Sequence, residues 1–511
     1  MIDYNLYTPD AIVGLTKKPI EEVLGDNLME RLDKIFYNYE YYSGKQHKGE
    51  MGELMRGIDM ERPDGLDYDP AQFDTNYYKA FIKRKARWQM AGQHGIEVKP
   101  KSESNEDVQR AQDYEELIYK LWKDNRIDSI KTELARHRLV GGSIHFKISF
   151  NARTGKLHWV KHLAYEVFPI YSDDGFQTVI GCDIIRAIEG EKQETLYHAQ
   201  HFRMNDEHTN CSFEDVVYDE KLNVVKTIQE EAWLDIDFVP VVSIYVDSSD
   251  EYMDDIEDMQ ALTTQLNKML EDAQDSLAFE MFGITVISNA KEGTAQQMKI
   301  APGAVVEIQA NQEGMRADMK TLENSFQWKE AFKDQYNRVK SALHELSGLP
   351  QIVPQELNFG GMNDRALQVL YQDIIQETQE HWLMWDIGLE ELFNKSIKYL
   401  QARQHMPKFA YDRKKVMADR DIDSLETKVN FVLPLPDDRE QLIDLLGKEV
   451  EYGFESHKGA MKRAGVVDVA KKQSELNEER EIAIAIESPY NDAYEPIEDD
   501  GTTIEVNSSE H

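Results

Sequence analysis

The chain has 511 residues and carries 95 Asp and Glu against 58 Lys and Arg, so its net charge is −37. A surface this acidic disfavours proteins that read nucleic-acid sequence, because those proteins neutralise phosphates with Lys and Arg, but it leaves open a surface past which nucleic acid slides without binding. Hydrophobic residues make up 41% of the chain, which excludes wholesale disorder, and the length predicts several domains with a large buried core.

The first half of the chain predicts an α+β body. An N-terminal arm and an aromatic-rich helix over residues 28–42 precede a helix over residues 76–90, whose basic side we interpret as pairing with acidic residues elsewhere. Helices over residues 107–122 and 128–139 end at a Gly-Gly pair. Short apolar runs with turn signals then predict strands over residues 143–150, 156–160, 167–171, 178–186, 195–202, 216–218, 224–233 and 238–242.

Two helical stretches, residues 251–282 and 322–346, enclose an insert of strand character, with predicted strands over residues 284–288 and 304–308. In each helix apolar side chains recur at spacings of three and four, which predicts a packed stripe. The stripes contain Ile256, Met259, Leu266, Leu270, Leu277, Phe332, Tyr336, Val339 and Leu343. A helix pair with a small domain at its far end makes a stalk, and a stalk repeated around a ring makes a channel.

The first of these helices is almost purely acidic outside its stripe, with Lys268 as its only basic residue. Like charges at i,i+4 weaken an isolated helix by roughly 0.2–0.5 kcal/mol per pair. The acidic face is therefore either ordinary solvated surface or the lining of a passage whose contents must not bind to it. The acidic residues in question are Asp254, Asp258, Glu271, Asp272 and Asp275.

A segment with several Gly and Pro residues, 347–363, follows the helix pair and is long for a connection within a compact domain. Its apolar residues argue against a flexible linker, so we expect a functional loop. The candidate loop residues are Gln351, Val353, Gln355, Asn358, Phe359, Gly360 and Gly361. Asn363 and Asp364 then offer an N-cap for a helix of about forty residues, with a kink expected at Gly388.

The remaining residues predict a smaller helical part. A strand over residues 428–433 precedes it, and its helices cover residues 439–452, 456–463 and 467 onward. From Glu481 the chain has acidic residues without basic partners, which is typical of a disordered tail.

Catalytic patterns are weak. The sequence has no Walker A, GxGxxG or Gly-x-Ser-x-Gly motif, and its 14 His and two Cys have no zinc-site spacing. Asp235 and Asp237 could form the carboxylate pair of a metal nuclease, but no His or third acid lies near them, which favours a solvent-facing strand edge. We therefore predict no enzyme, no metal and no cofactor.

Cysteine usage and the N-terminus bear on location. Cys182 and Cys211 are the only cysteines, which suits a reducing cytoplasm and leaves open whether the two pair. The N-terminus has no apolar core of signal-peptide length, and no run of eighteen apolar residues occurs. We expect a soluble chain made inside the cell, with no membrane partner.

The order of these parts is similar to that of portal proteins, the head-to-tail connectors of tailed bacteriophages, in the branch with a C-terminal helical crown. The resemblance covers residues 25–480 and is carried by order and spacing. The segments that carry it are residues 139–150, residues 165–171 (YEVFPIY), residues 238–247 (FVPVVSIYVD), the acidic helix that follows, and residues 359–371 (FGGMNDRALQVLY). Asn363 and Asp364 depart from the pattern, because relatives often place a small hydroxyl residue and Gly there.

The resemblance implies a multidomain α+β chain of wing, stem, clip and crown that assembles as a ring, usually of twelve subunits, at one vertex of the capsid. The implied parts are an arm and wing (1–245), a first stem helix (246–282), a clip (283–321), a second stem helix (322–346), a tunnel loop (347–363), a long kinked helix with a returning wing strand (364–436), a crown (437–480) and an acidic tail (481–511).

It also implies that double-stranded DNA passes through the ring without sequence recognition during packaging and ejection, past an acidic tunnel wall and the loop. The implied partners are the terminase large subunit, head-completion or tail adaptor proteins, the scaffold and the major capsid protein. The implied location is the virion, after assembly in the host cytoplasm. Two other functions stay open at this point, an acidic adaptor that mimics nucleic acid and the metal nuclease.

Overall fold

The computed structural model describes residues 28–44, 75–92, 94–172, 178–190, 194–247, 251–281, 285–289, 318–321, 328–351, 369–416, 426–433, 439–464, 466 and 469–487. The chain divides into two compact units. Unit 1 comprises residues 1–92 and 96–434, and unit 2 comprises residues 93–95 and 435–511. Helices and strands are mixed along the chain, which confirms the predicted α+β class.

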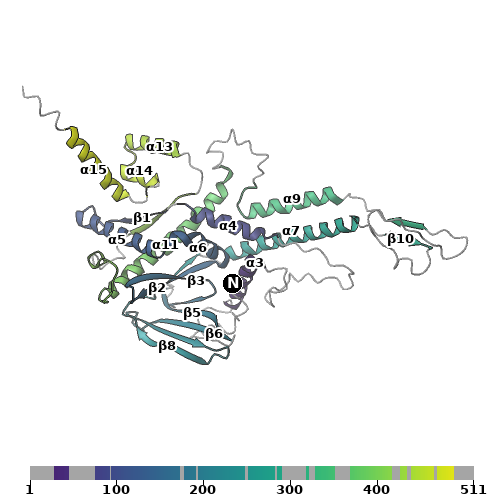
Figure 1. Cartoon of the computed structure of the whole chain (residues 1–511), viewed down its shortest axis with the longest axis horizontal. Helices are drawn as coiled ribbons and strands as arrows, with labels where there is room; N and C mark the ends of the chain where they lie inside the picture. The colour runs from purple at the N-terminus through teal and green to yellow at the C-terminus, as the bar shows by residue number, and fades with distance from the viewer. Residues whose placement is uncertain are drawn as a thin grey trace, which may run out of the picture. The chain divides into compact units, whose positions relative to one another are not determined.

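Among the described residues, unit 1 contains two antiparallel sheets of three or more strands (Figure 1). The larger has the strand order β4-β5-β6-β7-β8, and the smaller has the order β3-β2-β9. The strands are β2 (Ser143–Asn151), β3 (Lys156–Leu163), β4 (Val167–Tyr171), β5 (Val179–Glu189), β6 (Thr195–Met204), β7 (Cys211–Tyr218), β8 (Val224–Trp233) and β9 (Val241–Tyr245). All eight predicted strands of this region are present, and β9 lies a few residues beyond its predicted place.

The two edges of the larger sheet differ. Strand β4 is largely buried and contains Pro169, which lacks the N–H that another strand would need for pairing. Strand β8 is exposed over nearly its whole length, and its pairing with β7 has three register shifts. Val224, Ile228 and Trp233 are each more than half exposed on this strand.

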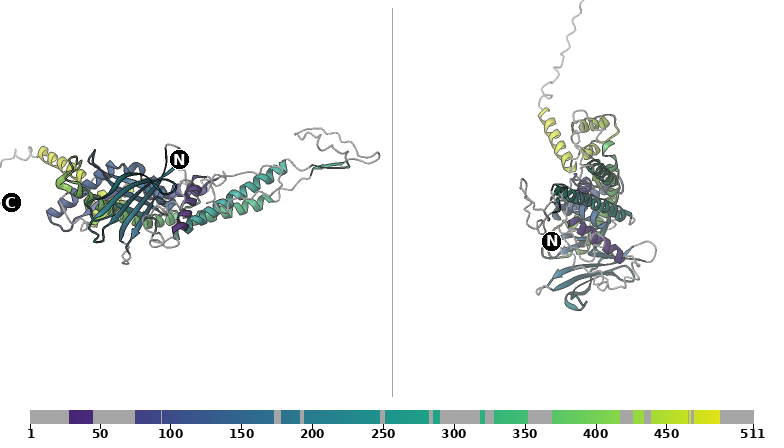
Figure 2. Two further views of the ribbon diagram at one scale, coloured as in Figure 1. Left: turned by 90° about the horizontal axis from the view of Figure 1, so that it is seen from below. Right: turned by 90° about the vertical axis from the view of Figure 1, so that its right-hand side faces the viewer.

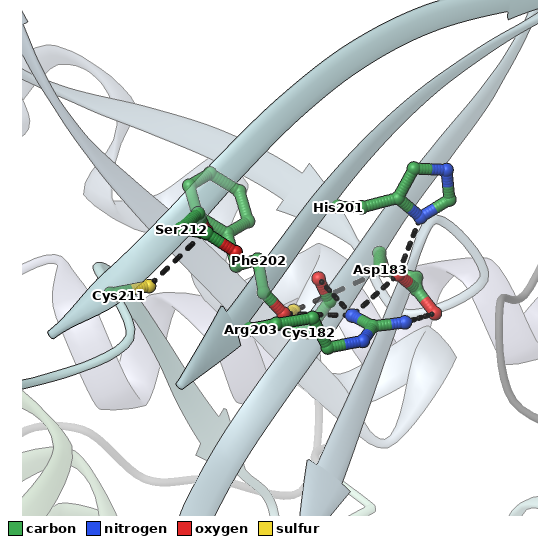
Figure 3. Close-up of polar contacts among 7 residues, drawn as sticks. All are labelled: Cys182, Asp183, His201, Phe202, Arg203, Cys211 and Ser212. Atoms are coloured by element: carbon green, nitrogen blue, oxygen red, sulfur yellow. Dashed lines mark hydrogen bonds and ion pairs between the residues drawn. The ribbon is translucent and has the colours of Figure 1, made fainter. Parts of the chain in front are cut away.

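Both cysteines lie in this sheet (Figure 3). Cys182 is on β5 and Cys211 is on β7, and the intervening strand β6 pairs with both. Both thiols are buried and free, so the open question of pairing is answered in favour of two separate thiols. Burial is the main cause that raises the pKa of each.

Helices surround the smaller sheet: α3 (Leu28–Ser43), α4 (Tyr77–Met90), α5 (Asn105–Asp124), α6 (Ile127–Gly141), α11 (Gln372–Arg403) and α12 (Arg413–Val416). Phe36 on α3, Phe146 on β2 and Trp385 on α11 belong to one hydrophobic core. The Trp159 Nε1–H donates a hydrogen bond of 2.8 Å to Ser396 Oγ, which ties β3 to α11 inside that core. Strand β12 (Glu426–Phe431) pairs with β1 (His94–Lys99). The sequence did not predict β1.

Helix α11 continues without interruption past Gly388. A Cβ at this position would lie 2.6 Å from Ile244 Cγ1 on β9, a distance that real Cβ atoms do not reach. The glycine is thus needed for the close approach of helix and strand. The kink expected there stays a prediction.

A pair of long helices, which we name the stem pair, follows β9. It consists of α7 (Glu251–Met281) and α9 (Trp328–Leu346), which lie side by side in the views of Figures 1 and 2. Strands β10 (Thr285–Ser288) and β11 (Asp318–Thr321) form an antiparallel hairpin at the end of the pair. The predicted helix, β insert and returning helix are therefore present, although β11 was not predicted and residues 304–308 lie outside the described residues.

Unit 2 contains α13 (Arg439–Glu451), α14 (His457–Arg463) and α15 (Val469–Glu487). All three predicted C-terminal helices are present, and α15 extends past Glu481, where we expected the acidic tail to begin. Over the described ranges, the search for a helix with the length and apolar character of a membrane span found none.

Candidate functional site

The stem pair is held at its base by the N-terminal helices. Ile256, Met259 and Leu266 of α7 are fully buried. The Tyr41 hydroxyl on α3 lies 3.0 Å from the Gln260 carbonyl oxygen, to which it donates, and 2.9 Å from Thr264 Oγ1. These contacts join the first half of α7 to α3 and so hold the base of the stem pair against the body of unit 1.

A row of polar side chains is buried beside the apolar seam of α7. Gln260, Thr263 and Asn267 are each no more than 2% exposed. Gln260 Nε2 donates to Asn38 Oδ1 at 2.8 Å, and Asn267 Oδ1 accepts from the Thr75 N–H at 3.2 Å. A buried amide stabilises a fold only when it is hydrogen-bonded, so these residues specify how α3 and the segment before α4 meet the stem.

The predicted acidic wall divides into exposed and buried residues. Asp258 and Asp272 are exposed and Asp275 is half-buried. Glu271, which we expected on the same wall, is only 8% exposed because it continues the buried polar row one turn after Asn267. It therefore does not lie on the exposed face of the subunit. The side chain of Asp254 lies outside the described residues.

The predicted stripes pack most tightly near the base. Val339 and Leu343 of α9 are buried, whereas Phe332 and Tyr336 are half-buried. The Tyr336 hydroxyl lies 3.1 Å from that of Tyr77 on α4. Toward the far end of α7, Leu270 is half-buried and Leu277 is 37% exposed. The far half of the stem pair thus leaves apolar surface uncovered in a single subunit.

The loop that follows α9 begins at a fixed point. Ser347 and Leu349 are buried, Gly348 adopts a left-handed φ of 64°, and His344 Nδ1 donates to the Leu349 carbonyl at 3.1 Å. Gln351 is the last residue of the loop that the structure describes, and its Oε1 accepts a hydrogen bond from Ser341 Oγ at 3.1 Å. The other six candidates, Val353, Gln355, Asn358, Phe359, Gly360 and Gly361, lie outside the described residues, as do Asn363 and Asp364.

Helix α4 contacts the chain on both sides of this loop. Phe81 lies edge-on to His344 of α9, with ring centroids 5.1 Å apart, and Trp88 lies 5.2 Å from Tyr371 just before α11. Lys85 forms a buried ion pair of 2.8 Å with Glu377 on α11. The interpretation of the basic helix as a partner for acidic residues is confirmed for Lys85.

Burial and ion pairing set the pKa of Glu377. Burial would raise this pKa, but the charge of Lys85 and the hydrogen bond from His381 outweigh it and lower the pKa. Glu377 is therefore held as a carboxylate on α11, and its ion pair with Lys85 ties α11 to α4.

A second buried ion cluster lies in the larger sheet (Figure 3). Asp183 on β5 is 1% exposed and accepts from His201 Nδ1 at 2.7 Å and from Arg203 Nη2 at 2.8 Å, both on β6. Burial would raise the pKa of Asp183, but these two partners lower it. The cluster joins the neighbouring strands β5 and β6.

The two carboxylates considered for a nuclease lie between β8 and β9. Asp235 has a left-handed φ of 53°, and both side chains are exposed. Within the described residues, no group of three or more His, Cys, Asp or Glu side chains is arranged to hold a metal ion. The solvent exposure predicted for the pair is confirmed, whereas the predicted place on a strand edge is wrong, because neither residue lies in a strand.

Comparison with known proteins identifies the family. A model of the family described as "Phage portal protein, SPP1 Gp6-like" matches residues 22–485, so the chain belongs to the phage portal proteins. The family is structural and not enzymatic, and membership implies a ring oligomer in a virion particle, together with capsid and tail proteins. The chain is thus a capsid portal component and no nuclease.

Solved structures show a looser likeness. One is a chain from the neck of an empty gene transfer agent particle, with 13% identity, a TM-score of 0.36, and coverage of 76% of this chain and 89% of that chain. Another is from the virion of a native gene transfer agent particle, with 11% identity, a TM-score of 0.33 and the same coverages of 76% and 89%. No curated protein matched the chain.

Proposed function

We propose that this chain forms a ring of twelve subunits at one capsid vertex and that double-stranded DNA passes through the ring along the stem pair during packaging and ejection. The observation that carries the proposal is the asymmetry of α7. One side holds the buried residues Ile256, Met259 and Leu266, and the opposite side exposes Asp258 and Asp272.

The acidic side of α7 suits a wall that DNA passes. Lys and Arg side chains would displace counterions from phosphates and hold the DNA, whereas carboxylates offer phosphates no partner. The repulsion acts only near the wall, because screening confines it to about 10 Å at 0.1 M salt. Asp258, Asp272 and half-buried Asp275 are the wall residues that we assign, and Glu271 is withdrawn from the set because it is buried.

Residues 352–363 make the constriction in this proposal. Its support is the anchoring on both sides to helix α4, which contacts His344 before the loop and Tyr371 and Glu377 after it. A segment whose two ends are fixed to the same helix, α4, can be placed repeatedly at one height around a ring.

The remaining partners follow from the same assembly. We propose that residues 283–321, which include the β10–β11 hairpin, dock the terminase large subunit during packaging and then the head-completion or tail adaptor proteins. Scaffold and major capsid protein surround the ring during assembly in the host cytoplasm. These assignments rest on family membership and on the place of the hairpin at the end of the stem pair.

A packaging assay with purified rings tests the wall. We expect the double variant Asp258→Lys and Asp272→Lys to form rings but to package DNA at least tenfold more slowly, because the new cations hold phosphates. In the same assay, a chain without residues 352–358 should form rings that package or retain DNA poorly.

The matched control is Asp334→Lys, which makes the same charge change at an exposed position of α9. It should package DNA at the normal rate if α7 alone lines the channel. Unchanged packaging by the double variant would refute the wall. Loss of the ring in the shortened chain would show that the loop is a packing element.

A further inference from the structure

The two most exposed large apolar side chains of the described residues lie next to each other in unit 2. Phe454 is 85% exposed and Tyr452 is 71% exposed, with ring centroids 6.3 Å apart. On α13, Ile443 and Leu445 are also about half exposed. We call these four residues the unit 2 apolar patch.

The turn that carries the two aromatic rings is well fixed. The backbone N–H groups of residues 452–454 donate to carbonyls in the last turn of α13 at 2.9–3.1 Å. Gly453 has a left-handed φ of 73°, the conformation that commonly ends a helix. Arg463 on α14 pairs with Glu449 and Glu455 on either side of the rings. The rings are thus presented to solvent by an ordered turn.

Unit 2 has little core of its own. Among its described residues, Leu446 and Val469 are the only buried apolar side chains. Burying one large apolar side chain contributes about 1.5–3 kcal/mol, whereas fixing the backbone of each residue costs about 1–2 kcal/mol. Helix α13 has apolar residues on two sides, because Leu446 is buried and Leu445 is exposed. Apolar residues on both sides are typical of a helix that is covered on both sides. A second surface must complete the unit.

Ring assembly supplies that surface. In a closed ring every copy of unit 2 lies at the same height and at the same distance from the axis, so the same unit of the adjacent subunit is its neighbour. Ring contacts are head-to-tail, and therefore the patch must meet a different part of the neighbour. Helix α15 carries half-buried Leu476, and exposed Glu478 and Glu479 follow it within one turn. On the side of the patch, exposed Lys458 follows the aromatic turn.

We propose that the unit 2 apolar patch docks onto α15 of the adjacent copy, with Tyr452 and Phe454 as the anchors and Lys458 facing Glu478 and Glu479. Aromatic side chains held in fixed positions are typical anchors of protein interfaces. The proposal rests on the ring assembly of the proposed function.

Crosslinking in the full-length ring tests the contact. With Lys458→Cys and Glu479→Cys in one chain, both anchors stay in place, and a short bismaleimide should give a ladder of covalent multimers in denaturing gels. Cys182 and Cys211 are buried, so they contribute little background. Each single variant alone should give monomers, because a crosslink between adjacent copies needs both cysteines.

The outcomes separate this proposal from the proposed function. Intact rings in native mass spectrometry with no ladder, or with crosslinks confined to one chain, would overturn the contact and leave the ring in place. Protection of the cysteine at position 458 only after other virion proteins are added would assign the patch to such a partner. A chain that never forms rings would contradict the proposed function first and this contact with it.

A second variant removes the anchors without crosslinking. Tyr452→Ser with Phe454→Ser should speed subunit exchange between labelled rings at least tenfold. Val225→Ser, an exposed apolar residue outside unit 2, should leave exchange unchanged. Equal exchange in both variants would refute the role of the patch.

Discussion

At the scale of single residues, buried polar side chains set most of the chemistry of unit 1. His145 on β2 is 2% exposed and lies between two hydroxyls, with Nε2 3.0 Å from Ser143 Oγ and Nδ1 2.8 Å from Ser243 Oγ. Burial lowers the pKa of His145 to about 3, and the nearby charges of His162 and Arg31 add to the effect. The folded chain therefore holds this imidazole neutral.

This shift predicts acid sensitivity. Because the folded pKa is below the unfolded value of 6.5, the unfolded chain binds the proton first, and stability falls as pH drops from 6.5 toward 3. Between pH 7 and pH 5 the loss from this group is about 2 kcal/mol. His145→Asn should remove that part of the pH dependence, as measured by urea unfolding at both pH values. His405→Asn, at an exposed position, should keep it, and equal slopes in the two variants would contradict the assignment.

The residue scale is also where sequence reasoning was weakest. The spacing of apolar residues predicted the seam of α7, and Ile256, Met259 and Leu266 are buried as the stripe required. The same spacing could not show that Glu271 is buried, because burial of a carboxylate depends on what other segments bring to it. Gln260 and Asn267 were missed for the same reason, although three polar residues beside an apolar seam at helical spacing were a usable signal.

At the scale of elements, the long helices and most strands were predictable, including the short strand β10, whereas β1 and β11 were missed. The periodicity of α7 and the alternation in β8 fixed their bounds to within a residue. Strand β11 is only Asp318–Thr321 and has a polar sequence, so no apolar pattern of its own indicates its pairing with β10. Strand β1 alternates between buried and more exposed residues only from Ile96 to Lys99, which is too short a pattern to stand out in the sequence.

Helix α11 and β9 provide an element-scale prediction. Gly388→Ala should destabilise unit 1 by about 1–3 kcal/mol, because the new methyl group would overlap with Ile244. Gly447→Ala on α13 is the matched control, since a Cβ there has no heavy atom within 4 Å and alanine favours a helix. Thermal unfolding should show a lower midpoint for the first variant only.

A second substitution sharpens this test. The double variant Gly388→Ala with Ile244→Ala should lose less stability than the sum of the two single losses, because the shorter side chain removes the overlap, although truncating buried Ile244 has a cost of its own. Fully additive losses would mean that the glycine serves another purpose, such as the kink expected from the sequence.

At the scale of the whole molecule, charge and symmetry act together. Twelve copies of a chain with net charge −37 carry about −440 before counterions, so assembly must overcome repulsion between subunits. Apolar contacts such as the unit 2 apolar patch provide attraction that salt does not screen. The sequence predicted ring assembly only through family resemblance, because no pattern within one chain encodes a symmetry axis.

The ring itself gives a prediction of mass and salt dependence. Twelve copies of the 59.2 kDa chain give about 710 kDa, and native mass spectrometry should show a species of that mass. Negative-stain images of the same species should show a ring with a central hole. Raising salt from 0.05 to 0.5 M should shift the equilibrium from monomer toward ring, because screening weakens the repulsion. A monomer at all concentrations and salt levels would rule out the assembly.

The outer edge of the larger sheet has a consequence for the time before rings exist. The proposed ring needs several copies of the chain, so free subunits must stay apart from one another until the ring forms. Strand β8 is exposed, yet its three register shifts and the charges of Lys226, Glu230 and Glu231 make it a poor template for another strand, while Pro169 interrupts the opposite edge. Neither edge of the sheet thus favours pairing with a strand of another chain. Assembly is therefore left to surfaces that only a neighbouring subunit can complete.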